Sequence, residues 1–461
     1  MIYRALTWLL TLIARAFFRQ VEVVGLENVP TDGPVIFAGN HPNSLLDPVL
    51  IINTCGRRVS FAAKNTLFKS RLLKLVLDGL GAVPLARRDD NPGAAKLDND
   101  AAFTAMYTRL GEGGAIGIFP EGLSHDASQL AALKTGAARL ALGARARIGE
   151  PVKIIPCGLT FIHPARFRSR VLVQYGPAIE VSEAWAEKQT ADEKAAVKEL
   201  TGAIERGMRA LTVNAPDWET VRALDAVRRL YQPLDIEIED RVELARRFNA
   251  HYGDVKEDPR VVEVMGRVRD YQEDLDVLGV TDREIARGLD GNAVARKLAA
   301  YLSLFLFWVP LAIPGLPIHA PAILFAKFAG RHLTPRKDVI ATTKVLTGFL
   351  VVYTSYVVVA AILAWRFGWL SALLAFVILP ISGYASLQVY DRFKLVKRGS
   401  GALVRRLRFQ HELEHLRERR DGLTGDIIRT VNALKPKDLV LLFPRDDDAK
   451  SDATPAEAIP G

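Results

Sequence analysis

One short segment, residues 40–48, combines a base, an acid and several small polar side chains. It reads Asn-His-Pro-Asn-Ser-Leu-Leu-Asp-Pro. A histidine imidazole titrates close to neutral pH, so His41 is suited to take a proton from a hydroxyl group and return it to a leaving group. Asp47 is suited to hold one imidazole tautomer and to stabilise the imidazolium, as in a serine-type triad. An isolated histidine more often caps a turn, so this catalytic interpretation needs support from other residues.

Two later segments supply groups that complement a base. Glu121 offers a carboxylate, and Gly122 beside it permits close approach of the backbone to a ligand. Arg87 and Arg88 are adjacent guanidinium groups, which are suited to binding a phosphate dianion. Together with His41, these residues predict a site for a hydroxyl-bearing phosphate ester that is handled beside a membrane.

Short β-rich segments alternate with helical ones around these residues. We predict strands at 21–24, 35–38, 58–62, 82–85, 115–119, 153–160 and 171–175, and helices near 43–54, 66–78, 99–110 and 128–147. Such alternation is typical of an α/β sheet with helices on its faces, in which ligands bind at the ends of the strands. We therefore expect His41 and Glu121 each to follow a strand directly.

The charge and cysteine content exclude several classes of protein. The formal net charge is +9, but the basic residues cluster beside apolar blocks and no aromatic-interleaved basic motif occurs. This distribution favours a membrane surface over nucleic acid as the partner. The two cysteines, Cys55 and Cys157, are too few for a disulfide scaffold and fit a reducing cytoplasm. We interpret both as small buried hydrophobic residues.

Several apolar segments predict contact with a membrane. Residues 1–19 predict an interfacial helix; a signal peptide is the alternative, and Arg15 within the cleavage-like sequence argues against it. Prolines divide residues 298–326 into halves too short to span a bilayer, which favours a re-entrant hairpin. Residues 345–390 are long enough for a transmembrane hairpin, and basic residues on both flanks predict cytoplasmic ends.

These features divide the chain into six regions. They are an interfacial helix (1–19), a catalytic domain (20–182), a charged helical region (183–297), a membrane region (298–390), a cytoplasmic basic helical region (391–445) and a disordered tail (446–461). We interpret the charged region as a helical insert that covers the flank of the enzyme, with substrate gating as the alternative. We expect an integral membrane protein whose catalytic domain faces the cytoplasm.

Residues 411–415 contain a pattern that points to a different chemistry. They read His-Glu-Leu-Glu-His and match the zinc-protease pattern H-E-x-x-H. Arginines on both flanks are typical of a solvated or headgroup-facing helix, and no further Glu or His lies between Glu418 and Glu457. We therefore predict no metal site here.

The sequence resembles the glycerophosphate acyltransferases of phospholipid synthesis through four ordered blocks between residues 20 and 180. The blocks are residues 40–48, 81–90, 119–126 and 154–159. Residues 167–170, residues 213–220 and the membrane segments extend the resemblance toward the fungal-type glycerol-3-phosphate and dihydroxyacetone-phosphate acyltransferases. The resemblance implies an α/β acyltransferase domain, with a mixed sheet flanked by helices, plus a helical insert and C-terminal transmembrane helices.

The resemblance also implies roles for individual residues. His41 would deprotonate the glycerol hydroxyl for attack on an acyl thioester, with Asp47 as its partner. The expected substrate-binding residues are Arg87 for the phosphate, Glu121 and Gly122 for the glycerol phosphate, and Pro156 for the acyl donor. Asn43 and Ser44 are also expected to bind substrate. Most of the superfamily has four residues between the histidine and the aspartate, whereas five intervene here. On a regular helix the two side chains would point apart, so we expect a loop or bulge around Pro42 to bring them together.

We therefore expect a membrane-bound acyltransferase of phospholipid biosynthesis that transfers a fatty acyl group from acyl-CoA or acyl-carrier protein to glycerol 3-phosphate. The alternative acceptor is 1-acylglycerol-3-phosphate, which would give phosphatidic acid. A non-catalytic lipid-binding membrane protein is the alternative from another class, and the presence of both His41 and Asp47 argues against it. The predicted partners are the lipid bilayer, the acyl donor and a glycerol phosphate, with no nucleic acid and no cofactor.

Overall fold

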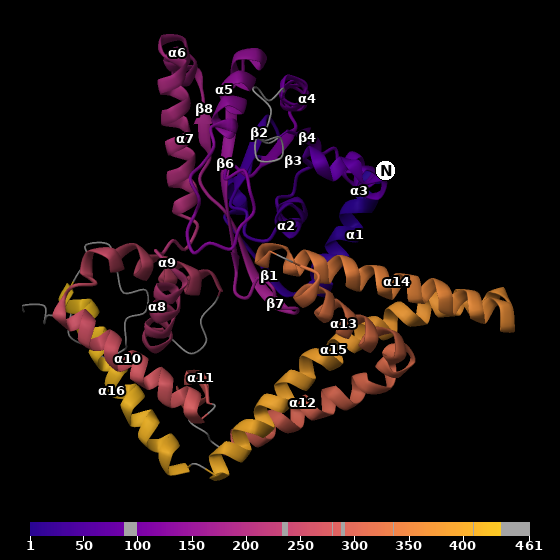
Figure 1. Ribbon diagram of the computed structural model, residues 1–461, viewed down its shortest axis with the longest axis vertical. Helices are drawn as coiled ribbons and strands as arrows, with labels where there is room; N and C mark the ends of the chain where they lie inside the picture. The colour runs from indigo at the N-terminus through magenta and orange to yellow at the C-terminus, as the bar shows by residue number, and fades with distance from the viewer. Residues whose placement is uncertain are drawn as a thin grey trace, which may run out of the picture. The chain divides into compact units, whose positions relative to one another are not determined.

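The structure is a computed structural model that describes residues 1–86, 99–232, 238–278, 280–286, 291–334, 336–408 and 410–434. The chain divides into two compact units (Figure 1). Unit 1 comprises Met1–Thr212 and Tyr301–Leu395, and unit 2 comprises Val213–Ala300 and Val396–Gly461. The expected disordered tail, residues 446–461, lies outside the described residues.

A mixed eight-stranded sheet lies at the centre of unit 1. Its strands are β1 (Phe18–Val24), β2 (Val35–Gly39), β3 (Val59–Lys64), β4 (Val83–Leu85), β5 (Ala115–Ile118), β6 (Val152–Phe161), β7 (Ser169–Tyr175) and β8 (Ile179–Val181). The order is β1-β7-β6-β2-β5-β3-β4, and β8 pairs with β6. Strand β6 runs antiparallel to β7 and β8, and the other pairs are parallel. The predicted mixed sheet is confirmed, and β8 is an addition to the predicted strands.

Helices cover both faces of the sheet, so its central strand β2 is buried on both sides (Figure 1). Val35 and Phe37 pack in one cluster with residues of α1 (Ile2–Phe17) and α2 (Leu46–Thr54). Ile36 and Ala38 face the other way, into a cluster with α4 (Asp100–Gly111), α5 (Gly136–Ile148) and α7 (Glu193–Arg209). The remaining helices of this region are η1 (Leu26–Asn28), η2 (Asn65–Lys69), α3 (Arg71–Gly79) and α6 (Glu183–Ala191).

Helix α5 begins at Gly136, later than the predicted start near residue 128. The intervening main-chain groups have other partners. The N–H of Ala131 donates to the carboxylate of Glu121, and the N–H of Lys134 donates to the carbonyl of Pro120. Residues 121–135 therefore form a loop bound to the end of β5 instead of a helix.

The parallel strands bring several loops to one edge of the sheet. Ala38 of β2 pairs with Ile118 of β5 on one side and with Pro156 of β6 on the other. Because the carboxyl ends of parallel strands meet at the same edge, the residues that follow β2 and β5 begin side by side. These residues include His41 and Glu121.

Apolar helices form the rest of unit 1. After the last part of α12 (Gly291–Ala312) come η4 (Ile313–Gly315), α13 (Leu316–His332), η5 (Lys337–Val339), α14 (Ile340–Phe367) and α15 (Trp369–Arg408). Three stretches are long and apolar enough to cross a membrane: Leu302–His332, Lys337–Phe367 and Trp369–Phe393. Large apolar side chains on them, such as Leu350, Val357 and Ile362, are more than half exposed, as expected of a lipid-facing surface.

The first apolar stretch is interrupted at η4, among its prolines. The hydroxyl of Ser382 on α15 accepts a hydrogen bond from the N–H of Gly315 at 2.8 Å and donates to the carbonyl of Ala312 at 3.0 Å. Backbone groups freed at a break within a membrane need such partners, since no water is present to replace them. The re-entrant path proposed for this stretch stays a prediction.

Unit 2 is helical in its described parts. Its core is built by α8 (Trp218–Tyr231), α9 (Ile238–Val255), α10 (Pro259–Leu278), α11 (Asp282–Ala286) and α16 (Gln410–Leu434). Arg420 of α16 is buried and donates to Asp282 at 2.8 Å, and Tyr271 donates to the same carboxylate at 3.1 Å. The charged region is helical, as expected, but its first part, α6 and α7, belongs to unit 1, so the boundary expected at residue 183 lies instead near residue 212.

Candidate active site

His41 lies just beyond β2, with its ring against the first turn of α2. His41 Nδ1 is 2.8 Å from Asp47 Oδ2. A carboxylate only accepts hydrogen bonds, so Nδ1 carries the proton of this contact, and Nε2 is the nitrogen left to accept another proton. The His41 side chain is 11% exposed and the Asp47 side chain is fully buried. The pair therefore has the orientation required of a base and its partner.

A tight turn between the two residues makes this contact possible. Ser44 has a φ of 50°, in the left-handed region, and its carbonyl accepts the N–H of Asp47 at 3.3 Å. The N–H of Asn43 donates to Asp47 Oδ2 at 2.7 Å. Helix α2 starts only at Leu46, so residues 42–45 form a loop that folds Asp47 back toward His41.

Burial shifts the acidity of Asp47. Its removal from water raises the pKa of the carboxyl above the usual 3.8, while the hydrogen bonds from His41 and from the Asn43 N–H act in the opposite direction. Within the described part of the chain, Asp47 Oδ1 has no hydrogen-bond partner. The carboxylate is thus aimed at His41 and Asn43 through a single oxygen.

An aromatic stack fixes the plane of the imidazole. The rings of His41 and Phe119 are 4.0 Å apart between centroids and are inclined by only 5°. Phe61 stacks behind Phe119 at 5.4 Å. Phe119 directly follows β5, and its position as the last residue of the strand predicted at 115–119 was the available signal for this role.

Glu121 holds the main chain of His41. Its Oε1 accepts the His41 N–H at 2.8 Å, and its Oε2 accepts the Ala131 N–H at 2.8 Å and the His125 ring Nε2–H at 2.5 Å. The residue is 2% exposed. Gly122 follows with a φ of +76°, and a Cβ there would lie 2.6 Å from Cδ of Lys134. Glu121 is therefore bound by protein groups at both oxygens, and the turn after it requires glycine.

His125 is a member of the site to which the sequence had assigned no role. Its N–H donates to the carbonyl of His41 at 3.1 Å, and its Nδ1 accepts the Ala127 N–H at 3.1 Å. The hydrogen bond to Glu121 raises the pKa of His125 above 6.5, against the lowering effect of burial. Residues 121 and 125 thus hold the His41 backbone through its N–H and its carbonyl.

Two asparagines anchor the loop from its other side. Asn43 is buried and its side-chain amide donates to the carbonyl of Pro164 at 3.2 Å. The Asn40 amide group continues the sheet pairing beyond β2, because it accepts the Leu159 N–H at 2.7 Å and donates to the Leu159 carbonyl at 3.1 Å. Asn40 belongs to segment 40–48, but its role could not be predicted from nearby sequence, because its hydrogen-bond partner Leu159 lies in β6. Ser44, the residue after Asn43, is half-buried.

Arg87 and Pro156 were also expected to belong to the site. Arg87 and Arg88 are outside the described residues. Pro156 is buried within β6, where its carbonyl accepts the Gly176 N–H at 2.9 Å. Glu412 and His415 of the H-E-x-x-H pattern are exposed on α16. The described residues contain no cluster of three or more His, Cys, Asp and Glu side chains suited to a metal ion.

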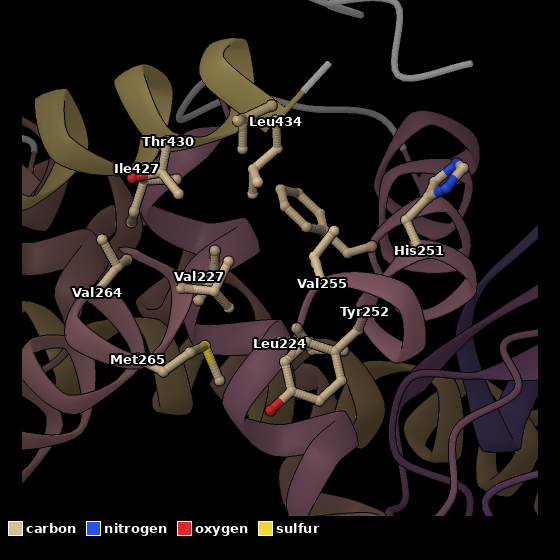
Figure 2. A pocket seen from close by; sticks show the side chains of 13 residues that line it. Leu224, Val227, His251, Tyr252, Val255, Val264, Met265, Ile427, Thr430 and Leu434 are labelled. Atoms are coloured by element: carbon tan, nitrogen blue, oxygen red, sulfur yellow. The ribbon is translucent and has the colours of Figure 1, made fainter. Parts of the chain in front are cut away.

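Unit 2 contains a pocket of a different character. Figure 2 shows it lined by side chains of α8, α9, α10 and α16, among them Val227, Val264, Met265 and Ile427. His251 on α9 lies at one side. The lining is almost entirely apolar, so it offers no arrangement of acid, base and nucleophile.

Two family models match the chain. Residues 20–160 match the family described as "Acyltransferase", and residues 223–439 match the family described as "Glycerol-3-phosphate acyltransferase 2 C-terminal domain". The first contains β2 and β5, together with the residues that contact His41, namely Asp47, Phe119, Glu121 and His125. The second contains most of α8, the other described helices of unit 2 and the apolar helices.

Three curated proteins illustrate the range of similarity. Glycerol-3-phosphate O-acyltransferase 1 of Saccharomyces cerevisiae is 27% identical over 452 residues, covering 75% of this chain and 59% of that protein. Glycerol-3-phosphate O-acyltransferase 2 of the same yeast is 31% identical over 294 residues, covering 59% of this chain and 39% of that protein. A 1-acyl-sn-glycerol-3-phosphate acyltransferase of Borreliella burgdorferi is 30% identical over 164 residues, 35% of this chain and 62% of that protein. The chain thus spans less than two thirds of each of these relatives.

Proposed function

Because this chain belongs to the fungal-type glycerol-3-phosphate acyltransferase family, we propose that it transfers a fatty acyl group from a thioester to a hydroxyl group of glycerol 3-phosphate. The observation that carries this proposal is the 2.8 Å contact between His41 Nδ1 and Asp47 Oδ2 at the carboxyl end of a central parallel strand. The contact leaves Nε2 as the proton acceptor, at the edge of the sheet where ligands bind in such folds.

The reaction follows from general base catalysis at His41 Nε2. As the acceptor hydroxyl oxygen forms a bond to the thioester carbonyl carbon, its proton moves to Nε2. The tetrahedral intermediate then collapses and the carbon–sulfur bond breaks. The leaving thiolate takes the proton back from the imidazolium, which gives the ester, a free thiol and neutral His41. No acyl-enzyme forms, because the acceptor attacks the donor directly.

Asp47 stabilises the transient imidazolium. Its carboxylate is fully buried and faces His41 Nδ1, so the positive charge that develops on the ring is met by a fixed negative charge in a poorly solvated place. Glu121 supports the same ring indirectly by holding the His41 main chain. In this proposal Glu121 and Gly122 shape the loop of His41, and Ser44 is the candidate for a direct contact with the acceptor.

Arg87 is the proposed phosphate ligand. Strand β4 ends at Leu85 and runs parallel to β3, which in turn runs parallel to β5. The chain therefore leaves β4 at the edge of the sheet that carries His41 and Glu121. The side chain of Asn99 holds Ala86 there by accepting its N–H at 2.9 Å and donating to its carbonyl at 3.1 Å. A guanidinium two residues beyond β4 suits the phosphate of the acceptor.

A second acceptor is kept as the alternative. The bacterial relative's name specifies 1-acyl-sn-glycerol-3-phosphate, and its similarity covers 35% of this chain. The similarity to the two yeast proteins named for glycerol 3-phosphate extends further, over 75% and 59% of this chain. This longer similarity supports glycerol 3-phosphate as the first choice. Acyl-CoA or acyl-carrier protein would supply the acyl group.

The proposed topology places the catalytic residues on the cytoplasmic side of a membrane. Three stretches are long and apolar enough to span it. Lys327 and Arg331 follow the first part of the membrane region, Lys344 lies near the start of the next, and Arg392 lies at the end of the last. Such basic flanks favour the cytoplasmic side, where acyl donors are available.

An acceptor panel tests the proposal. Purified membranes that contain the protein are given labelled acyl-CoA or labelled acyl-carrier protein, together with glycerol 3-phosphate, dihydroxyacetone phosphate or 1-acylglycerol-3-phosphate. The labelled lipid products are then separated. The proposal expects the highest kcat/KM with glycerol 3-phosphate. Transfer to 1-acylglycerol-3-phosphate alone would select the alternative acceptor, and transfer to none of the three, with either acyl donor, would contradict the proposed function.

A further inference from the structure

The start of the second apolar stretch contacts the loop that carries Glu121 and His125. Ser124 Oγ donates a hydrogen bond to Asp338 Oδ2 at 2.5 Å. Arg336 donates to the Ser124 carbonyl at 2.6 Å and to Asp338 Oδ2 at 2.7 Å. Asp338 lies in η5, immediately before α14, and is only 5% exposed. A residue at the foot of a candidate membrane helix is thus bonded to the candidate active-site loop more than 200 residues earlier.

Only short, directional contacts separate Asp338 from His41. Ser124 directly precedes His125, whose N–H donates to the His41 carbonyl at 3.1 Å. The ring of His125 donates to Glu121, and Glu121 accepts the N–H of His41 at 2.8 Å. Displacement of Ser124 would therefore be transmitted to both main-chain groups that fix His41.

The opposite side of the His41 loop is held in a similar way. Asn43 donates to the carbonyl of Pro164 at 3.2 Å, and Lys344 of α14 donates to the carbonyl of the next residue, Ala165, at 2.7 Å. In the same segment between β6 and β7, Arg168 forms a bidentate ion pair with Asp391 of α15: its Nε donates to Oδ1 at 3.1 Å and its Nη2 donates to Oδ2 at 2.6 Å. Both α14 and α15 therefore hold segments that touch the catalytic loop.

The chemistry of the Asp338 contact makes it suited to positioning. Burial of the Asp338 carboxylate without hydrogen-bond partners would cost free energy. The charge-assisted hydrogen bonds from Ser124 and Arg336 offset this cost and hold the carboxylate in one orientation. Arg336 itself is 57% exposed, which indicates that the specificity of the contact lies in Asp338 and Ser124. The contact does not face the ring of His41 and supplies no group to the reaction.

We propose that Asp338, through Ser124, is a positioning residue for His41, so that the foot of the α14 membrane helix forms part of the active-site framework. This inference rests on the proposed acyltransferase function. A misplacement of about 1 Å at a reacting group can cost as much as 100-fold in rate. Loss of the contact should therefore lower kcat, while KM for the acceptor changes little because no substrate contact is removed.

The experiment compares four proteins in membranes: wild type, Asp338→Asn, Ser124→Ala and the double variant. Lys337→Ala is the matched control, because Lys337 is the neighbouring residue, is 82% exposed and lies 3.8 Å from its ionic partner Asp126. Membrane-bound amount and thermal midpoint are measured for each. We expect each single variant to lose about 10-fold in kcat with KM within about two-fold of wild type. The double variant should lose no more than the worse single variant, because both changes break one contact.

The inference is overturned if kcat of Asp338→Asn and of Ser124→Ala equals that of Lys337→Ala, if the two losses multiply in the double variant, or if KM changes alone. Should Asp338→Asn fail to accumulate, Ser124→Ala removes only one hydroxyl and tests the same contact. Wild-type turnover is measured first, with the acceptor that is used best. Absence of wild-type transfer would contradict the proposed function, whereas normal transfer by all variants would contradict only the positioning role.

Discussion

His41 Nδ1 lies 2.8 Å from Asp47 Oδ2, although five residues separate the two in sequence. The contact forms because Ser44 adopts a φ of 50° and delays the start of α2 until Leu46. The same carboxylate oxygen accepts the N–H of Asn43 at 2.7 Å. The loop therefore orients the Asp47 carboxylate through the main-chain N–H of Asn43. The fifth intervening residue does not separate His41 from Asp47.

Replacement of Asp47 by asparagine should lower activity and raise stability. Without the carboxylate, the imidazolium loses its stabilising charge, and kcat should fall by about 100-fold to 10,000-fold. Burial raises the pKa of Asp47 above 3.8 in the folded state. Ionisation of Asp47 therefore lowers the free energy of unfolding, and this loss of stability develops as the pH rises above 3.8. The thermal midpoint of Asp47→Asn should exceed that of wild type near neutral pH, and the difference should shrink toward pH 4. An equal midpoint at all pH values, or unchanged kcat, would contradict this assignment.

Glu121→Gln should separate positioning from substrate binding. Both carboxylate oxygens of Glu121 accept protein hydrogen bonds, and the amide nitrogen of glutamine cannot accept. The His41 main chain should lose part of its support, so kcat should fall by about 10-fold or more with little change in KM for glycerol 3-phosphate. A rise in KM at constant kcat would instead indicate that Glu121 binds the acceptor directly.

The Glu121–His125 pair should make the stability of this loop depend on pH. The hydrogen bond raises the pKa of His125 above 6.5 in the folded state. Its stabilisation is therefore fully present below pH 6.5 and is lost as the pH rises through the higher folded-state pKa. In His125→Gln the side chain still donates to Glu121 but does not titrate. The difference between the thermal midpoints of wild type and His125→Gln should favour wild type more at about pH 6 than at about pH 9. The same difference at both pH values would exclude a raised pKa of His125.

Gly122→Ala should damage both stability and turnover. A left-handed backbone costs an L-residue about 1–2 kcal/mol, and the new Cβ would also press on the side chain of Lys134. Gly149→Ala is the matched control, because Gly149 has a φ of +81° with no atom near the added Cβ. Denaturant titrations should show that Gly122→Ala loses at least as much unfolding free energy as Gly149→Ala, and only Gly122→Ala should lower kcat. Equal kcat values for the two variants would show that the Gly122 turn does not position Glu121.

Much of the sheet could be predicted, because its strands are short apolar runs between turn residues. Strand β8 spans only Ile179–Val181, which is too short to display an alternating pattern. The start of α5 at Gly136 was predicted too early, since the preceding residues resemble a helix in composition but bond to Glu121 and Pro120. Local sequence does not encode such competition from distant partners.

The site could be predicted only as a set of residues. Strand ends identified His41 and Glu121, since both follow buried strands. The bond from the His41 N–H to Glu121 uses a main-chain donor, which has no signature in the residue types. The contact of Ser124 with Asp338 joins residues 214 positions apart and depends on how the apolar helices pack within unit 1. Such relationships follow from the tertiary fold alone.

The most direct test of the account is the rate of acyl transfer from labelled acyl-CoA to glycerol 3-phosphate by His41→Ala, compared with wild type and with His415→Ala, whose histidine is exposed on α16. All three proteins are assayed in membranes at equal amounts. His41→Ala should lose at least about 1,000-fold in kcat, while His415→Ala should match wild type. Activity of His41→Ala within about 10-fold of wild type would contradict general base catalysis by His41.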